Sequence, residues 1–332
     1  MNTDSLPLVS VISLGGTIAS IPSKHRGALP TLNAKELVEA IPNIDKIAHI
    51  EVTAFKQVPS SELTIEDIVQ LVQEVDKKVN QGAVGVVITQ GTDTLEETSF
   101  VSDLIRTLGS PLVFTGAMRN PTLMGADGSA NLLAAIQVAM SPACWELGTL
   151  VVLNDDIHAA RFVHKTHTSN PATFVSFPGG PLGFLTEGRV RIFSQSIPQA
   201  PLPIGQGPIP KVGLLKIGIG GDDDLLALIS ELNYQGLVVE SFGGGHVPMA
   251  MVEALTNLAI SMPVVLSSRT GRGEILRSTY GFPGSEEDLL DRGLISSGWL
   301  DGLKSRILLS ILLWGGAKQD EICNYFDNFG SR

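Results

Sequence analysis

Hydrophobic and polar positions along the chain follow two alternating patterns. Short apolar runs with little polar alternation are typical of strands that are buried on both faces of a parallel sheet. These runs are residues 8–14, 84–89, 111–116 and 149–153. Residues 64–79 instead carry apolar side chains at helical spacing, and Thr64 with Asp67 forms a capping pattern at the start. Buried strands separated by amphipathic helices predict an α/β fold with mainly parallel sheets.

A proline-rich segment divides this pattern into two parts. Residues 194–210 hold five prolines and almost no charge, and proline at this density cannot continue a central strand or helix. The alternation then restarts, with predicted strands at 212–217, 237–240 and 264–267 and predicted helices at 223–232, 249–260, 300–313 and 318–326. We therefore expect a larger N-terminal domain over 1–193, a linker over 194–210 and a smaller C-terminal domain over 211–332.

Composition and charge exclude several classes of protein. Of the 332 residues, 43% are hydrophobic and 17% are charged, which excludes disorder as the dominant state. The net charge is −11 and no cluster of Lys and Arg is present, so nucleic acid is not an expected partner. Residues 1–7 lack the features of a secretory signal, and no apolar stretch is long enough to span a membrane, so we expect a cytoplasmic protein. Cys144 and Cys323 are too few for a disulfide framework and are expected to be small apolar residues.

Candidate chemistry lies where the predicted strands end, because ligands in open α/β sheets bind beyond the carboxyl ends of the strands. The first strand ends in Gly15-Gly16-Thr17, which is either a plain turn or a turn that presents a hydroxyl. It lacks the glycine spacing of dinucleotide-binding and triphosphate-binding loops. The second strand ends before Thr92 and Asp93. Asp93 with Glu96 is either a helix cap, or Thr92 and Asp93 form a nucleophile or proton relay beside an ammonium anchor.

The third candidate segment, 154–168, contains three histidines and a lysine. His158, His164 and His167 do not have the spacing of a zinc-binding helix and no cysteine accompanies them, so no metal is expected. Lys165 lies among hydroxyl residues. It is either an ordinary surface lysine or a base, since a lysine held near other groups can lose its proton.

Taken together, these segments are similar to the bacterial-type asparaginase and glutaminase family of threonine amidohydrolases. The matching stretches are GGTIA (15–19), TQGTDTLEET (89–98), GAMR (116–119) with ADG (126–128), and LNDDIHAARFVHKTHT (153–168). Their order and spacing match throughout the first domain, whereas the second domain agrees more loosely through SSR (267–269) and the closing helices. The combination is far more specific than any of its parts.

The resemblance implies hydrolysis of L-asparagine to L-aspartate and ammonia through an acyl-threonine intermediate, without a cofactor. Thr17 matches the nucleophile, and Thr92, Asp93 and Lys165 match the supporting residues. A threonine hydroxyl needs a neighbouring base, and Lys165 would draw a proton through Thr92 while Asp93 orients the pair. Backbone N–H groups of the turn at Gly91 would stabilise the oxyanion.

The resemblance also assigns residues that bind the substrate, and it shows where this sequence departs from the family. The assigned residues are Ser60, Ser61, Thr92, Asp93, Ala117 and His246. Ser60 matches the serine that holds the α-carboxylate, whereas Ser61 stands where a glutamine is usual and His246 near a usual asparagine of the neighbouring subunit. The loop 21–32 lacks the usual tyrosine, for which Tyr280 is a candidate substitute or merely a residue that packs its own loop.

Other functions remain open at this point. Glutamine or another small aminoacyl amide is an alternative substrate, because one methylene group changes binding by only ~1–3 kcal/mol. A tRNA-dependent amidotransferase subunit is disfavoured, since such family members carry an additional N-terminal domain. A catalytically weak ligand-binding protein of the same fold is a third interpretation. The resemblance further implies a homotetramer, built as a dimer of dimers, although the apolar segment 300–314 is also explained by a place in the domain core.

Overall fold

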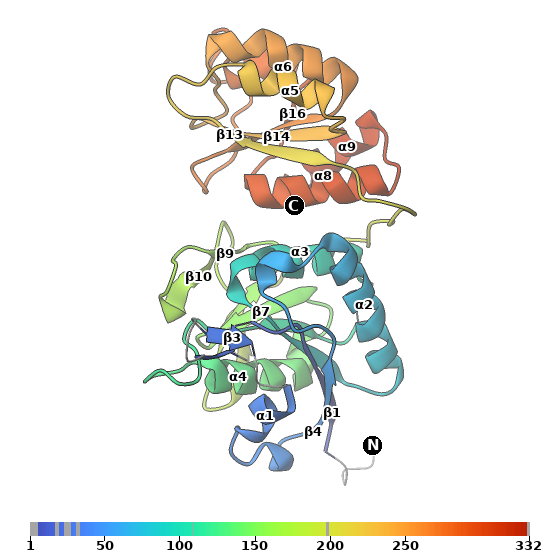
Figure 1. Cartoon of the computed structure of the whole chain (residues 1–332), viewed down its shortest axis with the longest axis vertical. Helices are drawn as coiled ribbons and strands as arrows, with labels where there is room; N and C mark the ends of the chain where they lie inside the picture. Colours follow the sequence, from blue (N-terminus) through green and yellow to red (C-terminus); the bar gives the residue numbers. More distant parts are fainter. Residues whose placement is uncertain are drawn as a thin grey trace. The chain divides into compact units, whose positions relative to one another are not determined.

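Figure 1 shows the chain as two units, each built from strands and helices. The computed structural model describes residues 6–16, 20–22, 28–30, 34–107, 109–196 and 199–330. Contacts divide the chain into Met1–Pro201 and Leu202–Arg332, so the division falls inside the segment expected to be a linker. Both units combine mainly parallel strands with helices, and the predicted α/β fold is confirmed.

In the described part of the chain, the first unit is built on an eight-stranded sheet in the order β12-β11-β8-β7-β6-β5-β1-β4. Its parallel strands are β1 (Leu8–Ser13), β4 (His49–Ala54), β5 (Gly85–Thr89), β6 (Leu112–Thr115) and β7 (Thr149–Leu153). Four of these strands lie in the predicted apolar runs. Their carboxyl ends share one edge of the sheet, where β1 is paired with β5 through Ser13 and Thr89.

Three further strands make the sheet mixed, which the sequence did not predict. They are β8 (Asp156–Ala159), β11 (Gly183–Thr186) and β12 (Arg189–Ile192), and each is antiparallel to its neighbour. The segment after Leu153 was expected to be an open strand exit. Instead, Asn154 and Asp155 both adopt left-handed conformations, with φ of 53° and 64°, and turn the chain back into β8.

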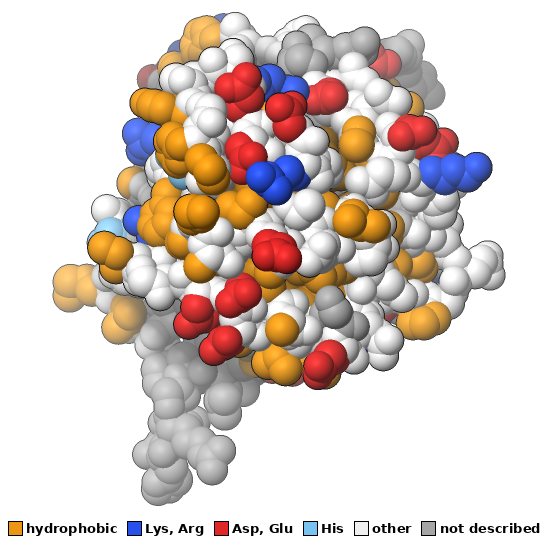
Figure 2. Space-filling model, turned by 90° about the horizontal axis from the view of Figure 1, so that it is seen from above, with side chains coloured by type: hydrophobic (Ala, Val, Ile, Leu, Met, Phe, Trp, Pro, Cys, Tyr) orange, Lys and Arg blue, Asp and Glu red, His pale blue; other side chains and the backbone are white. Residues whose placement is uncertain are grey.

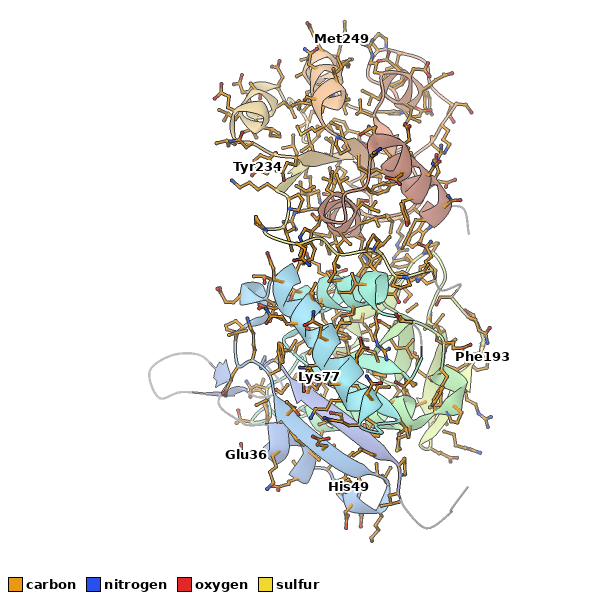
Figure 3. The ribbon with its side chains drawn as sticks, turned by 90° about the vertical axis from the view of Figure 1, so that its right-hand side faces the viewer. Glu36, His49, Lys77, Phe193, Tyr234 and Met249 are labelled. Atoms are coloured by element: carbon orange, nitrogen blue, oxygen red, sulfur yellow. The ribbon has the colours of Figure 1, made fainter. Side chains whose placement is uncertain are left out.

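Helices cover both faces of the first sheet (Figure 1). Helices α2 (Ile65–Asn80) and α3 (Leu95–Ile105) pack on one face, and α1 (Ala34–Glu39) and α4 (Gly128–Met140) on the other. Thr64 and Asp67 form the predicted capping box at the start of α2, because each side chain accepts a hydrogen bond from the backbone of the other. Figure 3 shows Lys77 on the outer side of α2, as the amphipathic pattern requires.

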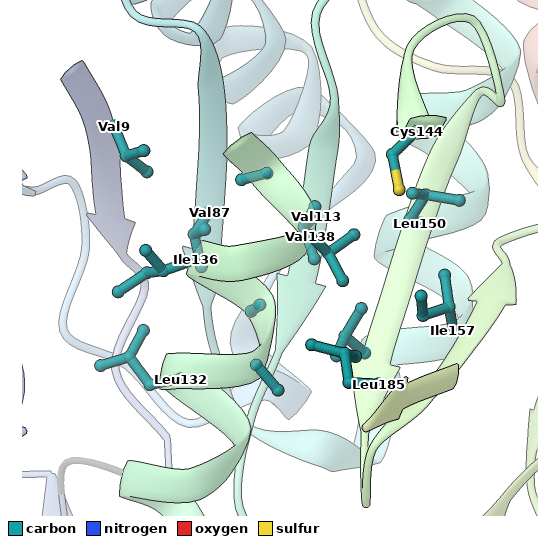
Figure 4. Close-up of a cluster of buried hydrophobic side chains, with 14 of the residues drawn as sticks. Val9, Val87, Val113, Leu132, Ile136, Val138, Cys144, Leu150, Ile157 and Leu185 are labelled. Atoms are coloured by element: carbon teal, nitrogen blue, oxygen red, sulfur yellow. The ribbon is translucent and has the colours of Figure 1, made fainter. Parts of the chain in front are cut away.

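Between the sheet and α4 lies a core of branched apolar side chains (Figure 4). Val87 and Val113 from the strands and Ile136 and Val138 from α4 are completely buried. Cys144 joins this cluster, and burial raises the pKa of its thiol to about 11. The expectation that Cys144 is a small apolar residue is therefore confirmed, while Cys323 is a free, half-buried thiol.

The second unit is built on a parallel sheet in the order β13-β14-β15-β16. Its strands are β13 (Val212–Lys216), β14 (Gly236–Ser241), β15 (Val264–Ser268) and β16 (Ile295–Ser296). Its helices are α5 (Asp224–Glu231), α6 (Met249–Ser261), α7 (Glu286–Asp291), α8 (Gly302–Trp314) and α9 (Gln319–Gly330). Figure 2 looks down on this unit and shows apolar side chains interspersed with acidic ones. The exposed apolar residues of this unit include Leu225, Leu228, Met249 and Ile260.

Helix α8 is apolar because it lies in the core of the second unit. Ile307, Leu308, Leu309 and Ile311 are buried, and the helix contacts β13, β14 and β15. Asp301 caps the helix by accepting a hydrogen bond from the backbone N–H of Lys304. The apolar side chains of α8 are therefore explained by burial in the core of the second unit and do not require a subunit interface.

The proline-rich segment makes specific contacts at both of its ends. In the first unit, the Ser196 hydroxyl donates to the Leu147 carbonyl oxygen. In the second unit, the Trp314 indole N–H donates to the Gly207 carbonyl oxygen, and Gly205 packs so closely against Trp314 that a side chain would not fit. Among the described residues, no helix is long and apolar enough to cross a membrane.

Candidate active site

Two strand ends of the first sheet come into direct contact. After β1, Gly15 and Gly16 adopt left-handed conformations with φ of 98° and 91°, which glycine adopts without strain. A Cβ atom on Gly16 would lie 2.0 Å from the backbone nitrogen of Gly91, so the two turns pack backbone against backbone. Thr17, the predicted nucleophile, lies outside the described residues. Its neighbour Gly16 therefore connects the first candidate turn to the second.

The second turn carries a hydroxyl and a carboxylate that meet one ammonium group. Thr92 and Asp93 lie in the single-turn 3₁₀ helix η4 (Thr92–Thr94), directly after β5. The Lys165 Nζ lies 2.9 Å from the Thr92 Oγ1 and 2.6 Å from the Asp93 Oδ1. Both distances are those of charge-assisted hydrogen bonds. The structure thus brings together three of the four predicted catalytic side chains.

This contact decides between the two interpretations of Asp93. Helix α3 begins at Leu95, and Asp93 precedes it by two positions. The Asp93 carboxylate pairs with Lys165, and 78% of the side chain is exposed to solvent. The helix-cap interpretation of Asp93 is therefore wrong. An exposed carboxylate beside a buried hydroxyl and a lysine is suited to an ammonium ligand.

Lys165 reaches the turn from a short antiparallel ribbon. It ends strand β9 (Val163–Lys165), which pairs with β10 (Phe174–Ser176) outside the main sheet. The side chain of Lys165 is only 13% exposed, and its Nζ contacts Thr92 and Asp93. The interpretation of Lys165 as an ordinary surface lysine is thus wrong.

The predicted substrate-binding residues of the first unit lie around the same turn. Ser60 is buried at the start of the 3₁₀ helix η3 (Ser60–Glu62), and the Thr94 hydroxyl donates to its carbonyl oxygen at 3.0 Å. Ser61 is exposed. Ala117 is buried and follows Gly116, at which a Cβ would lie 3.1 Å from the Thr92 methyl carbon.

The GAMR and ADG stretches are joined by a carboxylate. Asp127 accepts hydrogen bonds from the backbone N–H groups of Met118 and Arg119 at 3.0 and 2.9 Å. Asn131 on α4 also donates to Asp127 and to the Gly116 carbonyl oxygen. These bonds hold the end of β6 in place beside Thr92.

An open pocket of about 390 Å³ lies over this cluster. Its lining residues are Asp93, Glu96, Lys165, Thr166, His167 and Thr168. The volume is within the range of small-molecule sites, and the lining is polar and carries charges of both signs. The site therefore suits a small zwitterion better than an extended or apolar ligand.

The three histidines of this region have separate contacts. His158 is buried on β8, where its Nδ1 lies 2.8 Å from the Ser176 hydroxyl, and burial lowers its pKa to about 4. His164 faces Glu96, whereas the Nδ1 of His167 accepts two backbone N–H groups of the following turn. Among the described residues, no group of three or more His, Cys, Asp or Glu is placed to hold a metal ion.

His246, the predicted substrate-binding residue of the second unit, lies in an aromatic and acidic cluster. Its Nε2 is 3.1 Å from the carboxylate of buried Glu286, and its ring packs edge-on against Tyr280 and Phe282. Glu286 also accepts the backbone N–H groups of Thr279 and Tyr280. Sequence reasoning did not identify Glu286, because an acidic residue at the start of a helix is ordinarily explained as a favourable dipole interaction.

A second pair beside Lys165 was also missed. Glu96, on the first turn of α3, lies 3.3 Å from His164, the residue that precedes Lys165. The sequence pattern indicates Glu96 only as the partner of Asp93 in a cap, and His164 only as one of three histidines that do not have metal-binding spacing. The available signal was their position in the sequence, since Glu96 follows Asp93 by three residues and His164 directly precedes Lys165.

Comparison with known proteins agrees with this geometry over both units. The family model described as "Asparaginase, N-terminal" matches residues 8–198, and "Glutaminase/Asparaginase C-terminal domain" matches residues 211–326. The chain belongs to the asparaginase family. It is therefore an amidohydrolase, as the resemblance of its motifs predicted.

Individual relatives of this asparaginase-family chain cover nearly its whole length. An L-asparaginase of Bacillus licheniformis is 33% identical over 92% of this chain and 95% of its own length. A glutaminase-asparaginase of Acinetobacter glutaminasificans is 30% identical over 97% of this chain and 99% of its own. The crystal structure of a probable cytoplasmic L-asparaginase from Campylobacter jejuni matches with a TM-score of 0.86 and 30% identity, over 96% of this chain and 99% of that chain.

Proposed function

We propose that this amidohydrolase converts L-asparagine and water to L-aspartate and ammonia through an acyl intermediate on Thr17. The observation that supports this proposal is the position of Lys165, whose Nζ is within hydrogen-bond distance of both Thr92 and Asp93 at the mouth of a polar pocket. A binding protein needs a carboxylate for an ammonium group, but it does not need a lysine on a buried hydroxyl. Such a contact is useful for moving a proton.

Each side chain has a role that its surroundings support. In the proposed relay, Lys165 first gives up a proton to solvent in the open pocket. Its amine then takes the proton of the Thr92 hydroxyl, while the Thr92 oxygen accepts a proton from Thr17 or from the attacking water. Asp93 keeps the amine beside Thr92 and uses its exposed oxygen for the substrate ammonium. Backbone N–H groups of the turn at Gly91 stabilise the oxyanion that forms when Thr17 attacks the amide carbon.

Recognition of the amino acid end is proposed to involve Ser60, Ser61 and Ala117, with His246 contributed by a neighbouring subunit. Ser60 lies next to Gly91, where a Cβ would be 2.7 Å from its hydroxyl oxygen, so its position relative to the Thr92 turn is tightly defined. Ser61 is exposed and polar, which suits a carboxylate. The contacts of His246 with Glu286 orient its ring for a polar ligand.

Glutamine is the second candidate substrate, since one relative is named a glutaminase-asparaginase. The pocket is open and polar, so one extra methylene group would change transition-state binding by only ~1–3 kcal/mol, or ~10–200-fold. We therefore expect both amides to be hydrolysed, with asparagine preferred because the matching family model and an L-asparaginase relative are named for asparagine.

Ammonia release tests this proposal directly. Purified protein is incubated with L-asparagine, L-glutamine and their D-forms, and ammonia and the amino acid product are measured together. We expect equal amounts of ammonia and aspartate from L-asparagine. Saturable binding of asparagine without ammonia release would show a binding protein instead, and release from L-glutamine alone would make the glutaminase alternative correct.

We also propose that the protein is cytoplasmic and forms a dimer of dimers. The Campylobacter jejuni relative is named as cytoplasmic, whereas a Haemophilus influenzae relative is named as periplasmic. Cell fractionation distinguishes the two locations. Light scattering combined with size exclusion measures the mass, and a particle of four chains is expected.

A further inference from the structure

A second acid–base pair lies directly beside the Lys165–Asp93 pair. The His164 Nδ1 is 3.3 Å from the Glu96 Oε2, and their side chains are only 18% and 10% exposed. Asp93 in η4 and Glu96 on the first turn of α3 are three positions apart, while His164 and Lys165 are consecutive on β9. Two acidic residues of one segment are therefore matched to two basic residues of another.

Strand β9 depends on such contacts for its position. It has three residues and pairs with β10, where His164 lies opposite Val175, and this ribbon is separate from the eight-stranded sheet. A two-stranded ribbon alone is marginally stable. Figure 1 shows β9 beside α3, and the two elements are in contact. The location of the Lys165 amine thus depends on how the ribbon docks on α3.

His164 makes one contact with α3 and one contact within the ribbon. Glu96 faces its ring nitrogen from α3, and Phe177, just beyond β10, stacks on the ring at a centroid distance of 6.3 Å and an interplanar angle of 26°. The contact with Glu96 therefore ties β9 to α3, and the stack on Phe177 joins the two strands of the ribbon.

We propose that His164, through Glu96, is a positioning residue that holds the Lys165 Nζ against the Thr92 hydroxyl. His164 acts through Lys165 and does not touch the reacting atoms. The inference rests on the proposed function, because it assigns His164 a task in the same proton transfer. Loss of the His164–Glu96 contact should therefore lower kcat more than it changes KM, because misplacing a catalytic group affects the reaction step more than substrate binding.

Variants of His164 test the proposal better than variants of Glu96, because Glu96 also lines the pocket. His164→Leu keeps an apolar side chain against Phe177 and removes the polar contact with Glu96. His164→Asn restores that contact, since its amide nitrogen occupies nearly the place of Nδ1. His49→Leu is the matched control, because His49 is exposed at the start of β4 (Figure 3).

We expect His164→Leu to lower kcat for L-asparagine about 10-fold and to change KM less than ~3-fold, as for a group displaced by a fraction of an ångström. His164→Asn should recover kcat to within ~3-fold of the parent, and His49→Leu should behave as the parent. Thermal unfolding of each variant verifies the fold. If His164→Leu does not fold, His164→Gln replaces it. The amide of glutamine lies one bond farther from Cβ than that of asparagine, so it does not occupy the place of Nδ1 opposite Glu96, and the same loss of kcat is expected.

Two results would overturn the positioning role. One is a kcat of His164→Leu within ~2-fold of the parent, and the other is an equal loss in His164→Leu and His164→Asn, which would indicate shape alone. The parent protein separates this failure from a failure of the proposed function. If the parent releases no ammonia from any amide, the proposed function is wrong; if it is active and the variants match it, only the inference is wrong.

Discussion

Replacing Lys165 with methionine is the sharpest test of the proton relay. The change keeps most of the length of the side chain and removes the ammonium group, together with its hydrogen bonds of 2.9 Å to Thr92 and 2.6 Å to Asp93. A positioned general base contributes ~10²–10⁴-fold to the rate, which corresponds to about 3–5 kcal/mol of activation free energy. We therefore expect kcat for L-asparagine to fall by at least ~100-fold.

Folding should be affected much less than catalysis. Asp93 is 78% exposed, so water solvates its carboxylate once the lysine is removed. An ion pair with such an exposed partner stabilises a protein by about 0–1 kcal/mol. The thermal unfolding midpoint should then fall by less than ~4 °C. KM should rise less than ~10-fold, because Asp93 remains available to bind the substrate ammonium.

A closely matched lysine provides the control. The Lys78 Nζ lies 2.6 Å from the Glu51 carboxylate, and the lysine side chain is 10% exposed, compared with 13% for Lys165. Lys78 is near the end of α2, whereas the pocket lies at the start of α3. Ammonia release and unfolding are measured for Lys165→Met and Lys78→Met in parallel. A kcat of Lys165→Met within ~3-fold of the parent, or an equal loss in both variants, would refute the relay.

Three further outcomes are expected. Thr17→Ala should abolish turnover with an unchanged unfolding midpoint, and more than ~10% residual activity would exclude Thr17 as the covalent nucleophile. Chelators should leave ammonia release unchanged; activity lost in EDTA and regained with a divalent ion would contradict this. Burial lowers the pKa of His158 from 6.5 to about 4, so between these pH values the unfolded chain binds a proton that the folded chain does not. The free energy of unfolding should therefore fall as the pH decreases from 7 to 5. Denaturant titrations should show a smaller fall for His158→Asn than for the parent. An equal pH dependence of the two proteins would exclude this role of His158.

Local features of the fold were predictable because they depend on neighbouring residues. The capping box of Thr64 and Asp67 lies within four consecutive residues, and the strands of the parallel sheet appear as continuous apolar runs. Strand β8 was not predicted, because the residues of the turn before it do not specify a hairpin. Its turn consists of Asn154 and Asp155 in left-handed conformations, and these residues also occur in ordinary loops, so the sequence did not distinguish a hairpin from a strand exit.

The candidate site was only partly predictable. Glycines and hydroxyl residues at strand ends indicated Thr92, Asp93 and Lys165 as candidates, and the combined motifs indicated the family. Each residue alone kept an ordinary explanation, such as a cap for Asp93. That explanation failed when the structure placed the Lys165 amine on Asp93, although the two residues are 72 positions apart in the chain.

The sequence by itself determined the α/β class, the division near the proline-rich segment and the set of candidate residues for the chemistry. These properties follow from periodicity, from proline content and from motifs, all of which are written along the chain. Only the tertiary structure decided that Asp93 pairs with Lys165 and Glu96 with His164. Hydrogen bonds act over about 3 Å, so these pairs form only where the β9 ribbon packs on α3. That packing results from the burial of side chains throughout the unit.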